Sequence, residues 1–261
     1  MKNKSRAIKT QSWINQIKAY QKKAPELYNE GTKKFDSEFN INHYFDILEK
    51  IKLEEGWLAD YLYFKDRLGG EPVIISYPQS KRKEYAEIIK KMYDKKLEEK
   101  KRNGYSEAED IVEQFFNKDD VDNYLDHVKL DGSEESYLQL VILAALGSQF
   151  SLFWHALYND KEFVCTSEKA EKIVRRIGIV DEDIGTIDSQ LFEQDTVEKL
   201  KEISFEPQIT IKEDKVVVRL VFFTKWGGFI EAKYQVKKDF PHKIIERETE
   251  TLIDYDCGYV Y

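Results

Sequence analysis

The chain has 261 residues, of which 41% are hydrophobic and 13% aromatic, and its formal net charge is −8. With only 12 Gly and 5 Pro it can form one large or two small cores, and this excludes a mostly disordered chain. No apolar segment of the secretory type occurs near Met1, and Cys165 and Cys257 form neither a disulfide framework nor a metal knuckle. We therefore expect a cytoplasmic protein without a structural metal or cofactor. Its frequent Lys, Ile, Asn and Tyr are typical of bacterial chains.

The first half of the sequence is predicted to be mainly helical. Apolar residues recur at helical spacing from Trp13 to Ala24, where Pro25 ends the pattern, and again from Ile41 to Ile51. Further helices are expected after Pro78 over about 81–103, then over about 106–117 and 119–128.

A β-hairpin is predicted to interrupt these helices. The segment Tyr63–Tyr77 places an aromatic pair and a Gly-Gly turn before a β-rich run, so we expect two strands near residues 57–77. An isolated hairpin is marginally stable in water. We therefore expect it to pair with a sheet formed by the C-terminal part of the chain.

The most distinctive segment is Tyr137–Asn159, a run of 23 residues without a charged side chain. Asp131, followed by Glu134 at the spacing of a capping box, predicts the start of a helix over about 133–158. The Gln, Ser, His and Asn residues in this run would each need a polar partner inside a bilayer. A buried central helix is therefore favoured over a membrane span.

Four polar residues of this run fall at spacings of three and four, which would place them on one face of a helix. That face could line a binding pocket or lie sealed in the core, and the sequence leaves both open. Ser151 and His155, four residues apart, could act as a nucleophile and its base, with Cys165 farther along; a buried, hydrogen-bonded His155 is the alternative. The four residues are Ser148, Ser151, His155 and Asn159.

After the central segment, the sequence predicts a strand over Glu162–Thr166, a helix over 167–177 and then β-periodicity. Four β-like runs separated by turn residues predict an antiparallel meander over 204–261. Lys215–Thr224 is apolar on nearly both faces and is therefore expected to be its central strand. The expected fold class is α+β, with a mainly helical region over 1–203 packed on this meander in one compact unit.

Glu231-Ala232-Lys233 on a predicted strand, preceded by Asp214, resembles the D…ExK motif of restriction-endonuclease-like nucleases. In that family two carboxylates hold Mg²⁺ while the lysine assists attack on the phosphodiester. The resemblance covers about twenty residues, and the chain departs from the family after them, because Pro241 leads into another strand instead of a helix. The alternative is that Glu231 and Lys233 lie on the solvent face of an ordinary strand.

Charge is distributed unevenly along the chain. Residues 1–23 carry seven basic and no acidic side chains, which favours either nucleic-acid binding or a solvated helix face. Residues 103–160 carry twelve acidic and two basic side chains. The densest acidic run there lacks the Gly that an EF-hand calcium loop requires. It contains Asp119, Asp120, Asp122 and Asp126.

A second group of carboxylates occupies alternate positions of the last predicted strand, so that they point to one face. Their mutual repulsion would be relieved by a cation or a basic partner; otherwise they protect an edge strand from aggregation. They are Glu246, Glu248 and Glu250, followed by Asp254 and Asp256.

These features favour an interaction protein, because no complete catalytic set or cofactor motif occurs. We expect the acidic run to bind a basic macromolecular partner in the manner of a neutraliser or adaptor. The second carboxylate group could extend this acidic surface. One alternative is a hydrolase or metal-dependent nuclease that uses His155, or Glu231 with Lys233. The other is a regulator that binds a small molecule or a nucleic acid. The sequence leaves enzymatic activity undecided.

Overall fold

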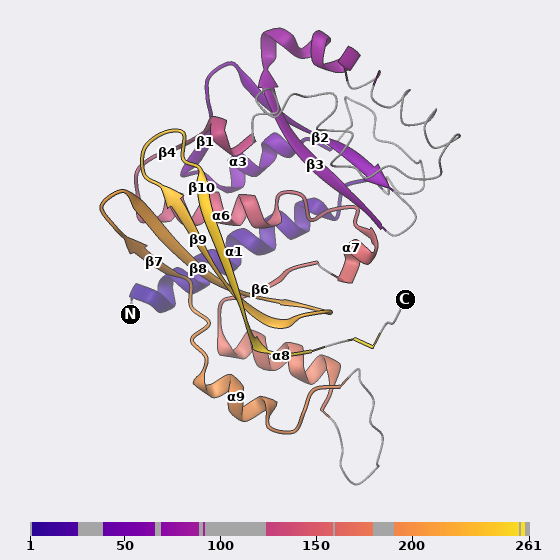
Figure 1. Cartoon of the computed structure of the whole chain (residues 1–261), viewed down its shortest axis with the longest axis vertical. Coiled ribbons are helices and arrows are strands. Elements are labelled where there is room, and N and C mark those ends of the chain that lie inside the picture. The colour runs from indigo at the N-terminus through magenta and orange to yellow at the C-terminus, as the bar shows by residue number, and fades with distance from the viewer. Residues whose placement is uncertain are drawn as a thin grey trace. The chain divides into compact units, whose positions relative to one another are not determined.

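The computed structural model describes residues 2–25, 39–65, 69–88, 91, 124–158, 160–179, 191–255 and 257–258. These residues form helices and mainly antiparallel sheets, which confirms the expected α+β class (Figure 1). The chain divides into two compact units. The first unit comprises residues 1–15, 158–236 and 244–261, and the second comprises residues 16–157 and 237–243. The change from the helical region to the meander, expected near residue 203, falls within the first unit.

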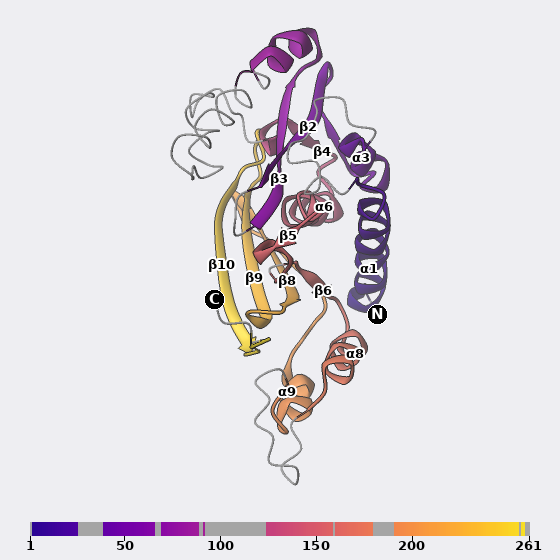
Figure 2. The same ribbon diagram turned by 90° about the vertical axis from the view of Figure 1, so that its right-hand side faces the viewer.

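A five-stranded sheet forms the first unit, in the order β10–β9–β8–β6, with β7 also paired to β8. β7 pairs with the first half of β8 and β6 with the second half, both antiparallel. β10 lies at the opposite margin of the sheet, beside β9 (Figure 2). The predicted C-terminal strands are thus confirmed, with β6 added from earlier in the chain. The strands are β6 (Glu162–Val164), β7 (Gln208–Ile211), β8 (Lys215–Thr224), β9 (Gly228–Lys237) and β10 (Ile244–Ile253).

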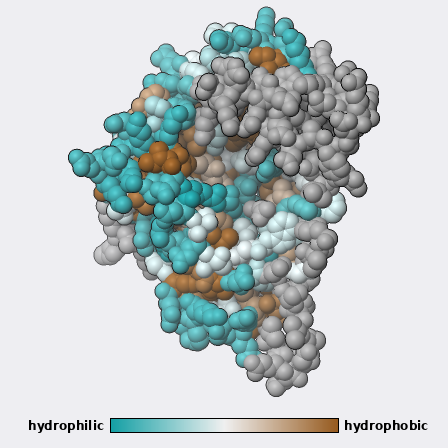
Figure 3. Space-filling model, in the orientation of Figure 1, coloured by the Kyte–Doolittle hydropathy of each residue, from teal (hydrophilic) through white to brown (hydrophobic). Residues whose placement is uncertain are grey.

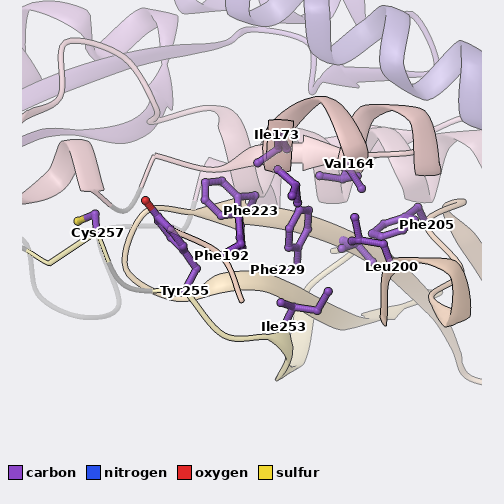
Figure 4. Packing of buried hydrophobic residues seen from close by; sticks show 13 residues of the cluster. Val164, Ile173, Phe192, Leu200, Phe205, Phe223, Phe229, Ile253, Tyr255 and Cys257 are labelled. Atoms are coloured by element: carbon purple, nitrogen blue, oxygen red, sulfur yellow. The ribbon is translucent and has the colours of Figure 1, made fainter. Parts of the chain in front are cut away.

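A hydrophobic core covers the end of this sheet where Phe223 and Phe229 lie (Figure 4). Ile173 reaches it from α8 (Ser167–Ile177), the helix expected over 167–177, and Leu200 reaches it from α9 (Thr196–Glu202). The last five residues of β8 are all buried, which confirms its central position. The other core residues are Val164, Ala170, Val174, Phe192, Phe205, Val221, Ile253, Tyr255 and Cys257.

A tight turn at Gly228 joins β8 to β9. The φ angle of Gly228 is +70°, and a Cβ atom there would lie 2.1 Å from the carbonyl oxygen of Ile253. Both the backbone conformation and the close approach of another chain segment therefore require glycine. The turn at Trp226-Gly227-Gly228 thus separates two of the β-like runs expected from the sequence.

Two small sheets belong to the second unit, one of β1 and β4 and one in the order β2–β3–β5. The predicted hairpin is present as β2 and β3. Its expected pairing with the C-terminal sheet is wrong, because Gly69 and Gly70 of β3 pair with Trp154 and Phe153 of β5. The uncharged central segment thus supplies the third strand. The strands are β1 (Ile51–Leu53), β2 (Trp57–Lys65), β3 (Gly69–Pro78), β4 (Val128–Leu130) and β5 (Phe153–Trp154).

The buried helix of the second unit is α6 (Glu134–Leu146). Its N-cap is Ser133, whose side chain accepts a hydrogen bond from the backbone N–H of Ser136. The expected cap at Asp131 is therefore wrong; the Asp131 carboxylate instead accepts hydrogen bonds from the backbone and hydroxyl of Ser133. Every residue of α6 from Ser136 to Leu143 is buried. This confirms that the start of the uncharged segment forms a core helix.

The end of α6 differs from the expectation, because the helix stops at Leu146 instead of continuing to about residue 158. Gly147 follows in close packing, where a Cβ atom would lie 2.9 Å from Cδ1 of Ile74. Farther on, Ser151 and Trp154 have φ angles of +49° and +45°, which no right-handed helix contains. Within the described ranges, no helix is long and apolar enough to cross a membrane.

The remaining helical predictions have mixed outcomes. The amphipathic N-terminal helix is confirmed as α1 (Lys2–Gln21), with Trp13 and Ile17 buried. The pattern from Ile41 to Ile51 forms only short turns before the chain enters β1. The helix expected at 106–117 lies outside the described residues, as does most of the one at 119–128. The other helical elements are η1 (Ile41–His43), α3 (Tyr44–Ile47), η2 (Gln79–Lys81), residues 82–88, η3 (Tyr124–His127) and α7 (His155–Tyr158).

Candidate functional site

An exposed feature of the first unit is the carboxylate row, by which we mean Glu246, Glu248 and Glu250 of β10. The antiparallel register places them opposite Gln235, Lys233 and Glu231 of β9, respectively. Directly opposite residues in an antiparallel pair share a face of the sheet. The three carboxylates therefore lie side by side on one face, and all three are exposed. In Figure 3, the surface where β7, β9 and β10 lie in Figure 1 is mainly hydrophilic, with small hydrophobic spots.

Two cations of the same sheet bind Glu231, the residue opposite Glu250. Lys233 Nζ lies 2.9 Å from Glu231 Oε1, and Arg219 Nε lies 2.5 Å from Glu231 Oε2. The side chains of Arg219 and Glu231 are only 13% and 11% exposed, so this ion pair is largely buried. Burial alone would favour the neutral acid, but hydrogen bonds from Lys233 and Arg219 hold the pKa of Glu231 below its ordinary value.

Lys233 is also influenced by the carboxylate row. Its hydrogen bond to Glu231, together with the charges of Glu231, Glu250 and Glu248, raises the pKa of Lys233 above its ordinary value. The ion pair that the Lys233 ammonium forms is nevertheless with Glu231 and not with the carboxylate row. Among the described residues, Glu246, Glu248 and Glu250 have no ion pair of their own within 4.0 Å.

The amide of Gln235 is the main neutral contact of the row. Its Nε2 donates to Glu246 Oε2 at 2.5 Å and more weakly to Glu248 Oε1 at 3.5 Å. Its Oε1 accepts from Lys215 Nζ at 2.5 Å, so that this lysine reaches the row only through the amide. A neutral donor leaves the charge of the row uncompensated.

The acidic run of the sequence is described only in part. Asp119, Asp120 and Asp122 lie outside the described residues. The side chain of Asp126 is only 14% exposed, and its Oδ2 lies 2.8 Å from Lys243 Nζ. The structure thus gives Asp126 a charged partner within the chain, unlike the carboxylates of β10.

The polar residues of the central segment do not share a helix face. Ser148 follows the end of α6, Ser151 lies in a bend, and His155 begins α7, while Asn159 lies outside the described residues. The Ser151 hydroxyl donates to the carbonyl oxygen of Pro25 at 2.6 Å. The predicted helical stripe is therefore wrong, because its geometry assumed that α6 continued.

Cys165 is an unreactive thiol in its present environment. It is buried, and that burial raises its pKa to about 12, so the thiolate that a nucleophile requires is absent at neutral pH. Both cysteines are free and buried. Among the other candidate catalytic residues, Glu231 and Lys233 are a pair that the structure brings into contact.

The second unit contains a compact aromatic and charged cluster that the sequence did not predict. The rings of Trp57 and His127 stack with centroids 3.3 Å apart, and His127 Nδ1 lies 2.9 Å from Glu54 Oε2. The hydrogen bond from His127 lowers the pKa of Glu54, with a further contribution from Lys129. The pairing of β1 with β4 brings Glu54 and His127 together. No local pattern signals this contact, because 73 positions separate the two residues.

A second missed feature is the backbone at Ser151 and Trp154, whose positive φ angles are uncommon for residues other than glycine. The Trp154 side chain is 45% exposed, and nearby Leu157 is 49% exposed. Residue type gives no signal for this conformation, since tryptophan and serine do not favour it. The exposed tryptophan is a candidate anchor for a partner.

Comparisons of the chain with protein-family models, with curated proteins and with solved structures found no match. In the described part of the chain, no group of three or more His, Cys, Asp or Glu residues has the arrangement of a metal site. A functional interpretation therefore depends on the chemistry of the surfaces described above, of which the carboxylate row is the most specific.

Proposed function

We propose that this protein is an intracellular interaction protein, of the neutraliser or adaptor type, that binds a basic macromolecular partner. The observation that carries this proposal is the carboxylate row on β10, three exposed acidic side chains on one face without an ion pair among the described residues. Lysine or arginine side chains of a partner would supply the missing positive charge. The two free cysteines are consistent with a reducing compartment.

The carboxylate row is available to a basic partner because the cations near it are paired with Glu231. Arg219 and Lys233 are engaged by Glu231, so an incoming basic group would not have to displace an existing ion pair from Glu246, Glu248 or Glu250. Charge complementarity at an exposed surface acts mainly on association rate and on the choice of partner. Tight binding also needs apolar contacts, and Ile245, which is 54% exposed, is adjacent to the row.

We also propose Asp119, Asp120 and Asp122 as a second acidic surface that binds the partner. This part of the proposal depends on the sequence alone, because the three residues lie outside the described residues. Asp126 contributes less, because its carboxylate is mostly buried and paired with Lys243. Two acidic surfaces allow two modes of binding, one at each. Charge reversals made separately at each surface distinguish these modes.

The nuclease alternative is less well supported by the geometry. A metal-dependent nuclease needs Glu231 to present a free carboxylate oxygen to a cation shared with a second acid. Here Lys233 binds one oxygen of Glu231 and Arg219 binds the other. Asp214 is exposed in the turn before β8. The described residues offer no specific observation that favours a second function.

Binding to a fluorescently labelled oligolysine peptide tests the proposal. We expect the triple variant Glu246→Lys, Glu248→Lys and Glu250→Lys to lower the affinity by about tenfold or more at low ionic strength, with the loss decreasing as salt rises. Reversal of Asp119, Asp120 and Asp122 to Lys measures the second surface in the same assay. Circular dichroism verifies that each variant stays folded.

A matched control reverses Glu168, Glu198 and Glu202 to Lys. These residues are exposed on α8 and α9, so that the net charge changes by the same amount while β10 is untouched. Equal loss of affinity in the control and in the β10 variant would show that only net charge matters. Unchanged binding in both acidic-surface variants, or a hydrolytic activity lost on Lys233→Ala or His155→Ala, would overturn the proposal.

A further inference from the structure

β10 is an edge strand, since only one of its two sides is paired with another described strand. It is the last strand of its sheet, and β9 is its one neighbour among the described residues. Residues 245–251 are all exposed, so neither face of the strand is covered along most of its length. Figure 2 shows β10 at the outer margin of the β8–β9–β10 part of the sheet. A strand in this position carries a row of backbone N–H and C=O groups that can pair with another chain.

The regular part of this edge has a defined length. Register shifts occur between Ile244 and Glu246 and between Thr251 and Ile253. Bulges of this kind bend a strand and interrupt the hydrogen-bond ladder. Between them, the six residues Glu246–Thr251 pair with β9 without a break. We call this segment the edge window.

The two faces of the edge window differ in chemistry. The carboxylate row occupies one face, and the alternate residues Arg247, Thr249 and Thr251 occupy the other. On that second face, the Arg247 guanidinium carbon lies 5.5 Å from the centre of the Tyr234 ring. A strand added beside the window would therefore meet acids on one face and β-branched side chains on the other.

We infer that the basic partner binds as an added β-strand, an extended segment of another protein that pairs with the edge window and carries lysine or arginine at alternate positions. Those positions face Glu246, Glu248 and Glu250, while the intervening residues are β-branched or apolar and lie beside Thr249 and Thr251. Main-chain hydrogen bonds supply affinity. The alternating charges determine the register, because a shift of one residue would move the basic side chains to the face opposite the carboxylate row. This inference rests on the proposed function and specifies its mode.

The sequence of β10 disfavours addition of an acidic strand. In a strand added with its own acids on the same face, carboxylates would lie directly opposite one another, which is destabilising. Self-pairing of two copies of β10 with the same faces aligned has this arrangement, because each copy brings Glu246, Glu248 and Glu250. The charges on this edge therefore disfavour non-specific strand pairing and favour pairing with a basic strand.

The test uses the full-length protein and three labelled peptides with alternating lysine and valine, each long enough to span the six-residue edge window. One peptide is unmodified. The second is N-methylated at every other backbone nitrogen, and the third at the remaining nitrogens. Charge and side-chain sequence are the same in all three. We expect one methylated peptide to bind about tenfold or more weakly, because its hydrogen bonds to β10 are lost, while the other keeps most of its affinity.

The outcomes separate this inference from the proposed function. Equal affinities of the two methylated peptides overturn strand addition; if the triple variant of Glu246, Glu248 and Glu250 still abolishes binding, the acidic surface remains as the proposed function. If the unmodified peptide binds both this triple variant and the Asp119, Asp120 and Asp122 variant as well as it binds the unsubstituted protein, the proposed function fails too. Sedimentation without peptide completes the test. A dimer that dissociates on Thr249→Pro would assign the edge window to a second copy of the chain and overturn the basic partner.

Discussion

Glu231 determines how the charged face of the C-terminal sheet is organised. Its carboxylate binds Arg219 and Lys233, and its pKa is held below the ordinary value of 4.5 by those partners despite burial. Arg219 Nη1 is buried without a hydrogen-bond partner in the described structure, so this guanidinium depends strongly on Glu231. Removing one member of a buried ion pair leaves the other uncompensated. The native conformation therefore favours ionised Glu231.

We predict that Glu231→Gln lowers the free energy of unfolding at neutral pH by about 1–3 kcal/mol, the usual cost of leaving a buried charged group without its partner. The depressed pKa gives the direction of the pH dependence. Ionised Glu231 stabilises the fold above its ordinary pKa of 4.5, and this contribution is lost as the pH falls through the lower folded value. The difference between the two proteins should therefore shrink in acid. Urea unfolding from neutral to acidic pH measures it.

The control for this experiment is Glu168→Gln. Glu168 also has a lowered pKa, caused by its contact with Lys172, but its side chain is 76% exposed on α8. Solvent screens such a pair, and little change in stability is expected. A Glu231→Gln protein as stable as the control variant, at every pH, would contradict the structural role of Glu231.

At the residue scale, the alternation of β9 was predictable but the burial of Glu231 was not. Ile230, Ala232, Tyr234 and Val236 alternate with polar residues, and this pattern correctly predicts a strand. Arg219, one of the two partners of Glu231, lies on β8, twelve positions away in the sequence. The contact between Arg219 and Glu231 depends on the pairing of β8 with β9. Spacing within one strand contains no information about that pairing.

At the element scale, α6 contributes much of the buried surface of the second unit. Leu140, Val141 and Ile142 are 0% exposed, and Leu143 is 1% exposed. A helix that is apolar on all sides gains its stability from tertiary packing. Truncation of one of its side chains leaves a cavity that rigid neighbours cannot fill.

We predict that Leu143→Ala lowers the free energy of unfolding by about 2–5 kcal/mol, because it combines loss of buried apolar surface with a cavity. The measurement is the shift of the urea midpoint at constant slope. Lys172→Ala provides a control in an exposed helical position, where the side chain is 68% exposed. A midpoint that Leu143→Ala leaves unchanged would rule out the core position of α6.

Elements with strong local signals were predicted well, whereas the end of α6 was not. α8 has Thr166 as its N-cap and Gly178 after its last turn, and both residues are typical helix boundaries. The uncharged run has Gly147 as its one marker, and its helix stops where Ile74 from β3 packs closely against that glycine. Such a contact between distant segments overrides a continuous apolar pattern. The helix face predicted for Ser148, Ser151 and His155 is wrong for the same reason, because it assumed that this helix continues beyond Leu146.

At the scale of the whole molecule, the chain crosses between its two units several times. α1 begins in the first unit and ends in the second, and residues 237–243 of the second unit separate β9 from β10 of the first. A boundary between sequence regions could not predict this, because composition changes only along the chain. The overall α+β class was predictable, since it depends on the local period of each segment.

The basic N-terminal segment provides the last prediction. Deletion of residues 1–11 would remove buried contacts together with the charge, because Ala7 and Thr10 are 1% and 0% exposed. Substitution tests the charge without this loss. Changing Lys2, Lys4 and Lys9 to Gln removes three positive charges and takes the formal net charge from −8 to −11.

If the acidic surface captures a basic partner, this triple substitution should raise the association rate with oligolysine by about twofold, because a more negative protein attracts the peptide more strongly at low salt. Stopped-flow fluorescence at several ionic strengths measures the rate, and the effect should vanish as screening increases. A basic segment that served nucleic acid would behave differently. The unsubstituted protein would then bind duplex DNA or RNA with a steep dependence on salt, and the substitution would remove that binding. This second result would replace the basic partner with a nucleic acid, whereas a faster association with oligolysine would support an acidic protein whose positive N-terminal charges slow its own capture of a basic chain.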